Sequence, residues 1–273
     1  MIVLKSPREI ELMRRGGRIL ADLVERLRGL VRVGMSTLEI DEEVETFITR
    51  RGARPAFKGY RGFPASVCVS INEEVVHGIP SAHRRLKEGD IVGLDLGCIV
   101  DGYYADCAFT VAIGEVPPPV QALLDATRES LERAIAECRP GRRLGDVSHA
   151  VQRHVEAHGF SVVRAFVGHG IGRALHEDPQ VPNFGEPGRG PVLRPGMVLA
   201  IEPMVTMGGP GVRILDDGWT AVTEDGSLAA HFEHTVAVTE DGPDVLTRSE
   251  GASTAPSEAS PERGLRGRSP RSK

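Results

Sequence analysis

Apolar residues recur at helical spacing in two segments near the start of the chain. Residues 6–31 open with a capping-box pattern, with proline at the first helical position, and then carry apolar side chains every three or four positions. Residues 36–52 repeat the capping box, and Gly52 is a plausible helix stop. Both segments therefore predict helices, and a region of strand-like alternation follows from about residue 66 to residue 113.

The same order returns in the second half of the chain. Residues 120–138 and 144–159 have helical periodicity, and strand-like segments follow to about residue 245. Two short echoes, "HGIP" at His77 and "HGIG" at His169, fall in corresponding parts of the two halves. The repeated pattern predicts an α+β protein in which helices cover mainly antiparallel sheets that line a central cleft.

Composition agrees with a globular protein. The 273 residues are 40% hydrophobic with a net charge of -5, which suits one large or two small packed domains. No uncharged apolar run approaches the roughly 20 residues of a membrane span, and the start has no signal-peptide pattern, so a cytoplasmic protein is expected. The four cysteines form no CxxC pair and are expected to be reduced thiols.

Residues 249–273 differ sharply from the rest in composition. Ser, Pro, Gly and Arg dominate there, which predicts a disordered tail. The tail holds five of the 33 basic and three of the 38 acidic residues, which leaves 28 basic against 35 acidic residues in the body. That balance argues against a general nucleic-acid-binding surface. A solvated tail is the favoured interpretation, and contact with ribosomal or other nucleic acid is the alternative.

The stretch "LDLGCIVDGYYADCAFTV", residues 94–111, reads as two buried strands joined by a tight turn. If its central Asp-Gly dipeptide forms the two-residue loop, cross-strand partners have numbers that sum to 203. Asp106 then lies opposite Gly97, which shares a strand face with Asp95. The two aspartates become diagonal neighbours, with backbones roughly 7 to 8 Å apart.

Two ionised carboxylates on one apolar face need a counter-charge, because each loses hydration and they repel each other. The hairpin contains no Lys or Arg, although pairing with arginines elsewhere or turn capping is the structural alternative. Glu202 in "VLAIEPMV" and Glu233 in "AAHFEHTVAV" occupy strand-like segments, and His169 lies between glycines. Four carboxylates and one imidazole can hold two divalent cations roughly 3.5 to 4 Å apart, with a bridging hydroxide as the nucleophile.

Five segments together resemble the type I methionine aminopeptidases: "SVCVSINEEVVHGIPS", "VGLDLGCIVDGYYADCAFT", "FVGHGIGRALHEDPQVPNF", "AIEPMV" and "HFEHTVAVTEDG". They occur in that family's order, and the resemblance covers residues 1 to about 248. It implies a pseudo-twofold pita-bread fold, with one catalytic domain over residues 1–248 built from pseudo-repeats of about 1–113 and 117–245. The activity implied is removal of the initiator methionine from nascent proteins whose second residue is small, by hydroxide attack from a dinuclear metal centre.

The resemblance also implies the metal ligands. They are Asp95, Asp106, His169, Glu202 and Glu233. Asp95 would bind the first cation and His169 and Glu202 the second, while the other two carboxylates would bridge. The cofactors expected are two divalent ions, Co, Mn, Fe(II) or Zn, because a set of carboxylates with one imidazole is oxygen-rich.

Three residues receive catalytic roles from the resemblance. Glu202 would carry a proton to the leaving amine, His176 would stabilise the oxyanion, and His77 would hydrogen-bond the scissile amide. The substrate's α-amine would coordinate a metal and contact Asp106. His231 and His234, which flank Glu233, have no position in the motifs and receive no role.

A pocket for the methionine side chain is the last feature implied. Its wall would comprise Phe57, Tyr60, Phe63, Cys68, His77, Leu175 and Trp219, with His176 also contacting substrate. Phe57 replaces a small side chain, often cysteine, of the bacterial enzymes and Phe63 replaces a tyrosine, although Phe57 packing outward is an alternative. An apolar, polarisable wall favours an unbranched thioether.

The partners expected are nascent polypeptide N-termini near the ribosome, with no membrane contact, and the protein is expected to be a monomer. Two alternatives stay open: a non-catalytic binding protein on the same fold, and a related aminopeptidase of different N-terminal specificity. Other chemistries lack their signatures, because the chain has no GxSxG elbow and no GxxxxGK[ST] phosphate loop.

Overall fold

The computed structural model describes residues 1–249, and residues 250–273, which hold all but the first residue of the predicted tail, lie outside the described part. Four long helices occur in the two expected pairs. They are α1 (Pro7–Leu30), α2 (Thr37–Arg50), α3 (Pro118–Ala136) and α4 (Leu144–Ala157). All four predicted helices are confirmed, with ends that differ by at most two residues from the predicted bounds.

Capping groups explain where the first two helices begin and end. In α1 the Ser6 side chain accepts a hydrogen bond from the Glu9 N–H, and the Glu9 carboxylate accepts one from the Ser6 N–H at 2.8 Å. Ser36 and Glu39 form the same reciprocal pair at the start of α2. Two N–H groups that would lack helical partners are satisfied at each start. Beyond α2, Gly52 takes a positive φ of 74°, which suits glycine and stops the helix.

Strands occupy the regions between the helix pairs and after them. The first half contains β1 (Arg54–Pro55), β2 (Val67–Ile71), β3 (Glu74–Val76), β4 (Ile91–Val100) and β5 (Tyr103–Ala112), with a 3-10 turn at Tyr60–Gly62. The second half contains β6 (Ser161–Val162), β7 (Gly168–Gly170), β8 (Glu177–Val181), β9 (Val198–Ile201), β10 (Met204–Thr206), β11 (Val212–Ile214), β12 (Ala221–Thr223), β13 (Ala229–His231), β14 (Glu233–Thr239) and β15 (Gly242–Val245). The strand-rich regions begin and end as predicted, except that short β1 precedes residue 66.

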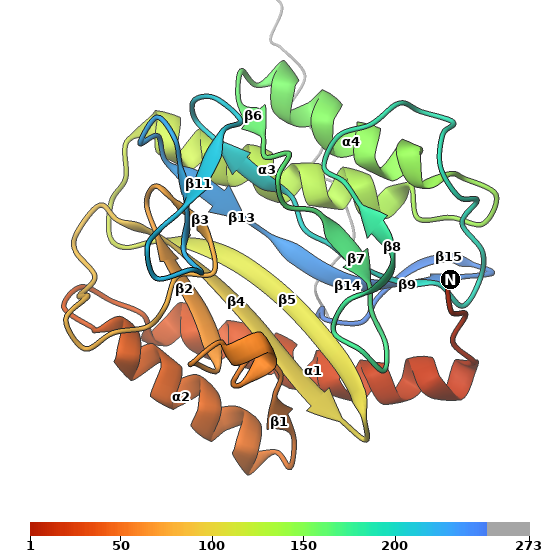
Figure 1. The fold of residues 1–273 in the computed structure, drawn as a ribbon, viewed down its shortest axis with the longest axis horizontal. Coiled ribbons are helices and arrows are strands. Elements are labelled where there is room, and N and C mark those ends of the chain that lie inside the picture. Colours follow the sequence, from red (N-terminus) through yellow and green to blue (C-terminus); the bar gives the residue numbers. More distant parts are fainter. Residues whose placement is uncertain (250–273) are drawn as a thin grey trace, which may run out of the picture.

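The large sheet unites both halves of the chain (Figure 1). Its strand order is β1-β4-β5-β14-β9-β7-β8, with β2 also paired to β4 and β15 to β14. Every pair described is antiparallel, as the sequence predicts. Strand β14, almost the last in the chain, lies between β5 of the first half and β9 of the second.

The β4–β5 hairpin has the predicted register. Val100 pairs with Tyr103 and Gly97 pairs with Asp106, so each pair of numbers sums to 203. The loop residues Asp101 and Gly102 have φ values of 49° and 80°. Positive φ at both positions is the requirement of a type I′ turn, which fits the twist of a two-residue hairpin.

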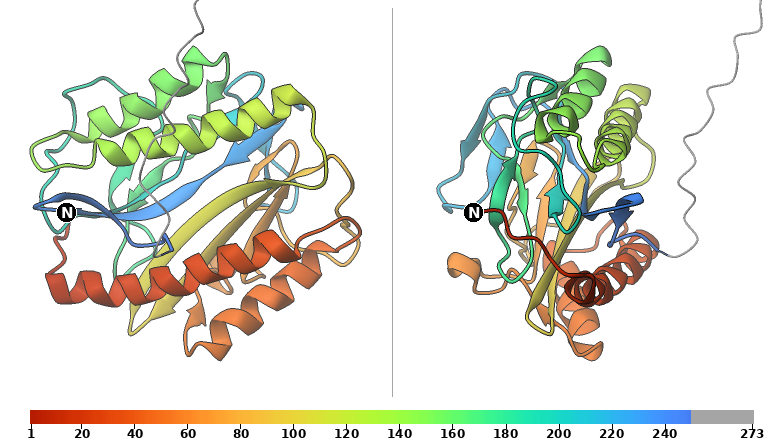
Figure 2. Two further views of the ribbon diagram at one scale, coloured as in Figure 1. Left: turned by 180° about the vertical axis from the view of Figure 1, so that it is seen from behind. Right: turned by 90° about the vertical axis from the view of Figure 1, so that its right-hand side faces the viewer.

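The helices cover one face of the large sheet, and β3, β11 and β12 lie over the other (Figure 2). Successive side chains of β4 point alternately to the helix-covered face and to the other face. Leu94, Leu96 and Cys98 belong to the main core on the helix side, whereas Ile99 packs in a separate cluster on the opposite side. The face that carries Asp95 is therefore the one that the helices leave uncovered. No helix among residues 1–249 is both long and apolar enough to cross a membrane.

Candidate metal centre

Four of the five predicted ligands come from strands of the large sheet, and the fifth directly follows another strand of it. Asp95 lies on β4, Asp106 on β5, Glu233 at the start of β14, and His169 on β7. Glu202 lies immediately after β9, because Pro203 interrupts the strand-like segment between β9 and β10. The order β4-β5-β14-β9-β7 brings these side chains together although they are up to 138 residues apart in the sequence.

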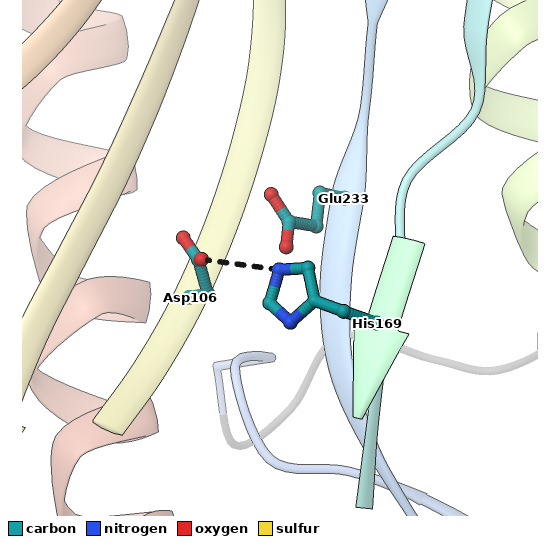
Figure 3. A group of neighbouring side chains, drawn as sticks. All are labelled: Asp106, His169 and Glu233. Carbon is teal, nitrogen blue, oxygen red and sulfur yellow. Dashed lines mark ion pairs between the residues drawn. The ribbon is translucent and has the colours of Figure 1, made fainter. Parts of the chain in front are cut away.

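Three of these side chains form a compact donor cluster. Ligand atoms of Asp106, His169 and Glu233 all lie within 4.8 Å of one another (Figure 3). The His169 Nε2 atom is 3.9 Å from Asp106 Oδ2 and 3.5 Å from Glu202 Oε1. The separations are long for hydrogen bonds and are close to those of donors that share a cation.

Unsatisfied buried atoms show that the cluster suits a cation. Asp95 Oδ1, Asp106 Oδ1 and Glu233 Oε1 are enclosed, and none accepts a hydrogen bond from the described residues. Within residues 1–249 the only ion pairs that the four carboxylates form are with histidines, so pairing with arginine is not supported. A buried carboxylate that has neither donor nor counter-charge is costly, and a divalent cation removes that cost.

The pKa values of the carboxylates lead to the same conclusion. Burial, together with repulsion from the neighbouring carboxylates, raises the pKa of Asp106, Glu202 and Glu233 well above the usual range. Burial raises the pKa of Asp95 to about 7. Like charges in one desolvated site disfavour ionisation of all of them, so the metal-free cluster retains protons that a bound cation would displace.

His169 is oriented to act as a ligand. Its Nδ1 atom is 2.9 Å from the Gly170 carbonyl oxygen, and a carbonyl can only accept, so Nδ1 carries the proton. Burial lowers the pKa of His169 to about 4, which keeps the ring neutral. Its Nε2 lone pair therefore faces the carboxylates, in the arrangement typical of metal-binding histidines.

His231 also belongs to the cluster, which the sequence analysis missed. Its Nε2 atom lies 3.9 Å from Glu202 Oε2 and 3.9 Å from Glu233 Oε2, is buried, and has no hydrogen-bond partner. The sequence did contain a signal for His231. Side chains two residues apart in an extended segment share a face, so residue 231 lies on the same face as Glu233. His234 points the other way, where its Nδ1 atom bonds Thr247 Oγ1 at 2.8 Å.

The two histidines predicted to be catalytic flank the cluster. The His176 ring lies 4.3 Å from the His169 ring, and its Nδ1 atom forms a 2.8 Å hydrogen bond with the Tyr60 hydroxyl. His77 has a left-handed φ of 62°, rare for a residue with a side chain, and its ring lies 6.3 Å from that of Trp219. Burial is the main cause that lowers the pKa of His77 to about 4, so this ring is neutral.

Six of the seven residues predicted to line the methionine pocket belong to one apolar cluster, and the seventh, His77, lies beside Trp219. The buried members of the cluster include Phe57, Phe63, Cys68 and Leu175, and Tyr60 and Trp219 pack against them at the edge. The Phe63 and Trp219 rings meet edge to face at 5.2 Å. The cluster shares a face of the sheet with Asp95, because Cys68 on β2 pairs with Asp95 on β4.

Phe57 packs inward, so the alternative of an outward-facing ring is wrong. Its side chain is only 7% exposed, and its ring covers Gly97 so closely that a Cβ atom there would lie 2.6 Å from Phe57 Cε1. Gly97 lies opposite Asp106 and shares the site face of β4. The ring therefore borders both the apolar cluster and the carboxylates.

Comparison with known proteins agrees with this site. Residues 11–240 match metallopeptidase family M24, and the chain belongs to that family. Methionine aminopeptidase 1 of Bacillus subtilis is 53% identical over 248 residues, which are 91% of this chain and 100% of the relative. A methionine aminopeptidase of Clostridium perfringens is 53% identical over 247 residues, 90% of this chain and 99% of the relative. Within family M24 the chain thus belongs with the methionine aminopeptidases, which are hydrolases, and family membership implies the use of a divalent metal.

Similar solved structures identify the fold. The crystal structure of methionine aminopeptidase from Thermotoga maritima superposes with a TM-score of 0.90 at 49% identity, and the match covers 91% of this chain and 100% of that one. A prolidase from Pyrococcus furiosus, 24% identical with a TM-score of 0.74, shares the fold alone; the match covers 91% of this chain and 66% of that one. The architecture is therefore the α+β pita-bread fold, as the sequence analysis predicts.

Proposed function

We propose that the chain removes the N-terminal methionine from polypeptides whose second residue is small. The observation that carries the proposal is the convergence of four carboxylates and His169, on or directly after neighbouring strands, beside an apolar cluster. A non-catalytic binding protein on the same fold would have no need to keep such a costly set of buried carboxylates. Relatives named for methionine, rather than for another N-terminal residue, favour this specificity.

Asp95, Asp106, His169, Glu202 and Glu233 would hold two divalent cations, with Asp106 and Glu233 shared between them. Support comes from the number of carboxylates, because four negative charges balance two divalent ions. When bound, divalent cations act as Lewis acids toward a peptide carbonyl and lower the pKa of water toward neutrality. Co, Mn, Fe(II) and Zn remain the candidates.

The chain's own residues would handle protons and orientation. Glu202, whose carboxylate has a raised pKa when no cation is bound, would carry a proton to the leaving amine. His176, steadied by the Tyr60 hydroxyl, would donate a hydrogen bond to the oxygen that becomes negative. Neutral His77 would hydrogen-bond the scissile amide, and Asp106 would contact the substrate's α-amine, which explains a restriction to free N-termini.

The substrate's first side chain would lie against Phe57, Phe63, Cys68 and Trp219. An uncharged, polarisable wall accepts an unbranched thioether, and norleucine should be a fair substitute because it keeps the unbranched shape and only replaces the sulfur atom by a methylene. We infer that the natural substrates are nascent-chain N-termini met near the ribosome. We also infer that the protein acts as a monomer in the cytoplasm.

Steady-state kinetics on four tripeptides tests the proposal. The ratio kcat/KM should be highest for Met-Ala-Ser and lower for Leu-Ala-Ser and Met-Lys-Ser, and Met-Pro-Ser is the fourth peptide compared. Metal content should be measured on the same preparation, so that an unloaded protein is not mistaken for an inactive one. Preference for leucine over methionine, or fast cleavage before lysine, would overturn the specificity even if metal-dependent activity is present.

A further inference from the structure

A second group of metal-ligating side chains lies between α3 and α4, on the helical layer rather than in the sheet. His154 and His158 come from one face of the C-terminal end of α4 and from its C-cap, and Glu129 comes from α3. The three line one groove between the helices, which lie side by side in Figures 1 and 2. None of them belongs to the catalytic cluster described above.

His154 presents a buried nitrogen atom without a partner. The residue is 8% exposed, and its Nε2 atom forms no hydrogen bond with the described residues. That atom lies 3.4 Å from Glu129 Oε2. Two donors on one tetrahedral cation, at bond lengths of about 2.0 to 2.1 Å, are about 3.3 Å apart. The spacing therefore fits donors that share a metal ion better than it fits a hydrogen bond.

His158 supplies a third donor one helical turn further on. Its ring lies 4.4 Å from the His154 ring, as the i, i+4 spacing allows. Its Nδ1 atom is 2.8 Å from the His154 carbonyl oxygen, and since a carbonyl only accepts, Nδ1 is the protonated nitrogen. The Nε2 lone pair of His158 is thus free to bind a cation, in the tautomer that ligating histidines usually adopt.

The surrounding charges limit which cation fits. Arg133 and Arg153 line the same groove, and Glu137 beside them pairs with Arg142. One uncommitted carboxylate against two guanidinium groups does not suit Ca²⁺ or Mg²⁺, which require several oxygen donors. Two imidazoles with one carboxylate suit a borderline transition metal, and burial together with Arg133 lowers the pKa of His154.

We propose that His154, His158 and Glu129 bind one divalent transition-metal cation of the zinc class and so tie the C-terminal end of α4 to α3. His154 and Glu129 already have the spacing required. His158 is exposed, and its side chain would have to turn about its torsion angles to complete the set, giving up its hydrogen bond to the His154 carbonyl. Water would occupy the fourth position. The site is separate from the peptidase chemistry and does not depend on the proposed substrate.

Zinc binding by matched variants tests this site. Wild type, His158→Gln and Glu129→Gln are dialysed against a series of Zn²⁺ concentrations, and bound zinc per chain and melting temperature are measured. All three proteins keep the catalytic ligands, so a difference reports the groove alone. We expect both variants to lose one zinc site, or to bind it at least about tenfold more weakly, and to lose the part of the melting-temperature gain that this zinc confers.

Two controls make the outcome decisive. His83→Gln removes an exposed histidine far from the groove in sequence and should bind zinc as wild type does. Hydrolysis of Met-Ala-Ser by the Mn²⁺-loaded groove variants should be unchanged, which excludes general misfolding. Wild-type zinc stoichiometry and affinity in both groove variants, or an equal loss in His83→Gln, would overturn the proposal.

Discussion

Burial raises the pKa of each carboxylate of the catalytic cluster, and among residues 1–249 no lysine or arginine pairs with any of them. Asp106 is the clearest case, because burial and the charges of Asp95 and Glu202 all disfavour its ionised form. In the metal-free protein a neutral residue of the same shape should therefore be tolerated at position 106. A bound cation reverses that preference, since it needs the negative charge.

Asp106→Asn should abolish peptide hydrolysis while the metal-free protein stays folded. The amide keeps the volume but cannot balance a shared cation, so kcat should fall below about a tenth of the wild-type value. The measurement is kcat for Met-Ala-Ser at saturating Mn²⁺, beside the melting temperature in EDTA. A variant that keeps more than a tenth of the rate would contradict a bridging role for Asp106.

The pH dependence of stability should reveal the raised pKa of Asp95. In the folded protein the pKa of Asp95 is about 7, above its ordinary value of 3.8. The contribution of Asp95 to the free energy of unfolding is therefore fully present below pH 3.8 and is lost as the pH rises toward 7. Metal-free Asp95→Asn should therefore gain stability relative to wild type between pH 5 and pH 7. Urea unfolding in EDTA at both pH values measures the difference. The comparison with wild type cancels the opposite contribution of the buried histidines, and a constant difference would show that Asp95 ionises normally.

Gly97 is required by the ring of Phe57. A Cβ atom at position 97 would lie 2.6 Å from Phe57 Cε1 and 2.9 Å from Ala56 Cβ, so Gly97→Ala should destabilise the protein by about 1 to 3 kcal/mol. Gly93→Ala on the same strand is the matched control, because its nearest contact would be an ordinary 3.7 Å. In a Phe57→Leu background the cost of Gly97→Ala should shrink. Equal costs at positions 93 and 97 would contradict the close approach of Phe57.

At the scale of secondary structure, local sequence signals govern where elements begin and turn. Ser36 is buried at the start of α2. Its hydroxyl oxygen accepts a hydrogen bond from the Glu39 N–H, and its hydroxyl donates one to the Glu39 carboxylate at 2.7 Å. Ser36→Ala removes that acceptor and should cost about 1 kcal/mol of unfolding free energy. Denaturant titration measures it, and Ser36→Thr, which keeps the hydroxyl, should recover most of the loss. An alanine variant as stable as the threonine variant would show that the cap contributes nothing.

The features that could be predicted from the sequence depend on contacts between near neighbours. Capping boxes located the starts of α1 and α2, and the Asp-Gly dipeptide determined the hairpin register that joins Asp95 to Asp106. Predictions failed where the structure depends on contacts between distant segments or on the interruption of a strand. Proline after Glu202 ends β9 one residue before the glutamate, and His231 enters the cluster although the motifs assign it no role. The inward packing of Phe57 depends on Gly97, 40 residues away, and the pattern of apolar residues along the sequence does not predict that contact.

At the scale of the whole molecule, the catalytic cluster connects both halves of the chain. Two of its carboxylates come from strands before α3, and the remaining ligands come from strands after α4. Cation binding should therefore stabilise the entire sheet as one cooperative unit rather than one half of it.

Removal of the metal should lower the melting temperature in a single step. At a free cation concentration of 100 times Kd, binding contributes about 2.7 kcal/mol of unfolding free energy, which EDTA should remove together with all peptidase activity. Scanning calorimetry with EDTA, and after addition of Mn²⁺ or Co²⁺, measures this. If metal removal shifted only a separate unfolding transition at lower temperature, the sheet would not unfold as one cooperative unit. Peptidase activity that survives complete chelation would contradict the metal centre itself.

The central position of β14 also determines when the enzyme can first act. Strands β5 and β9 are joined through β14, and Glu233 is its first residue, so neither the sheet nor the ligand set is complete until residues 233–239 have been synthesised. A copy still growing on the ribosome has made Asp95 and Asp106 but lacks the strand that unites them with His169. The enzyme therefore has no peptidase activity through most of its own translation, and any trimming of a growing chain's first residue must be done by copies finished earlier.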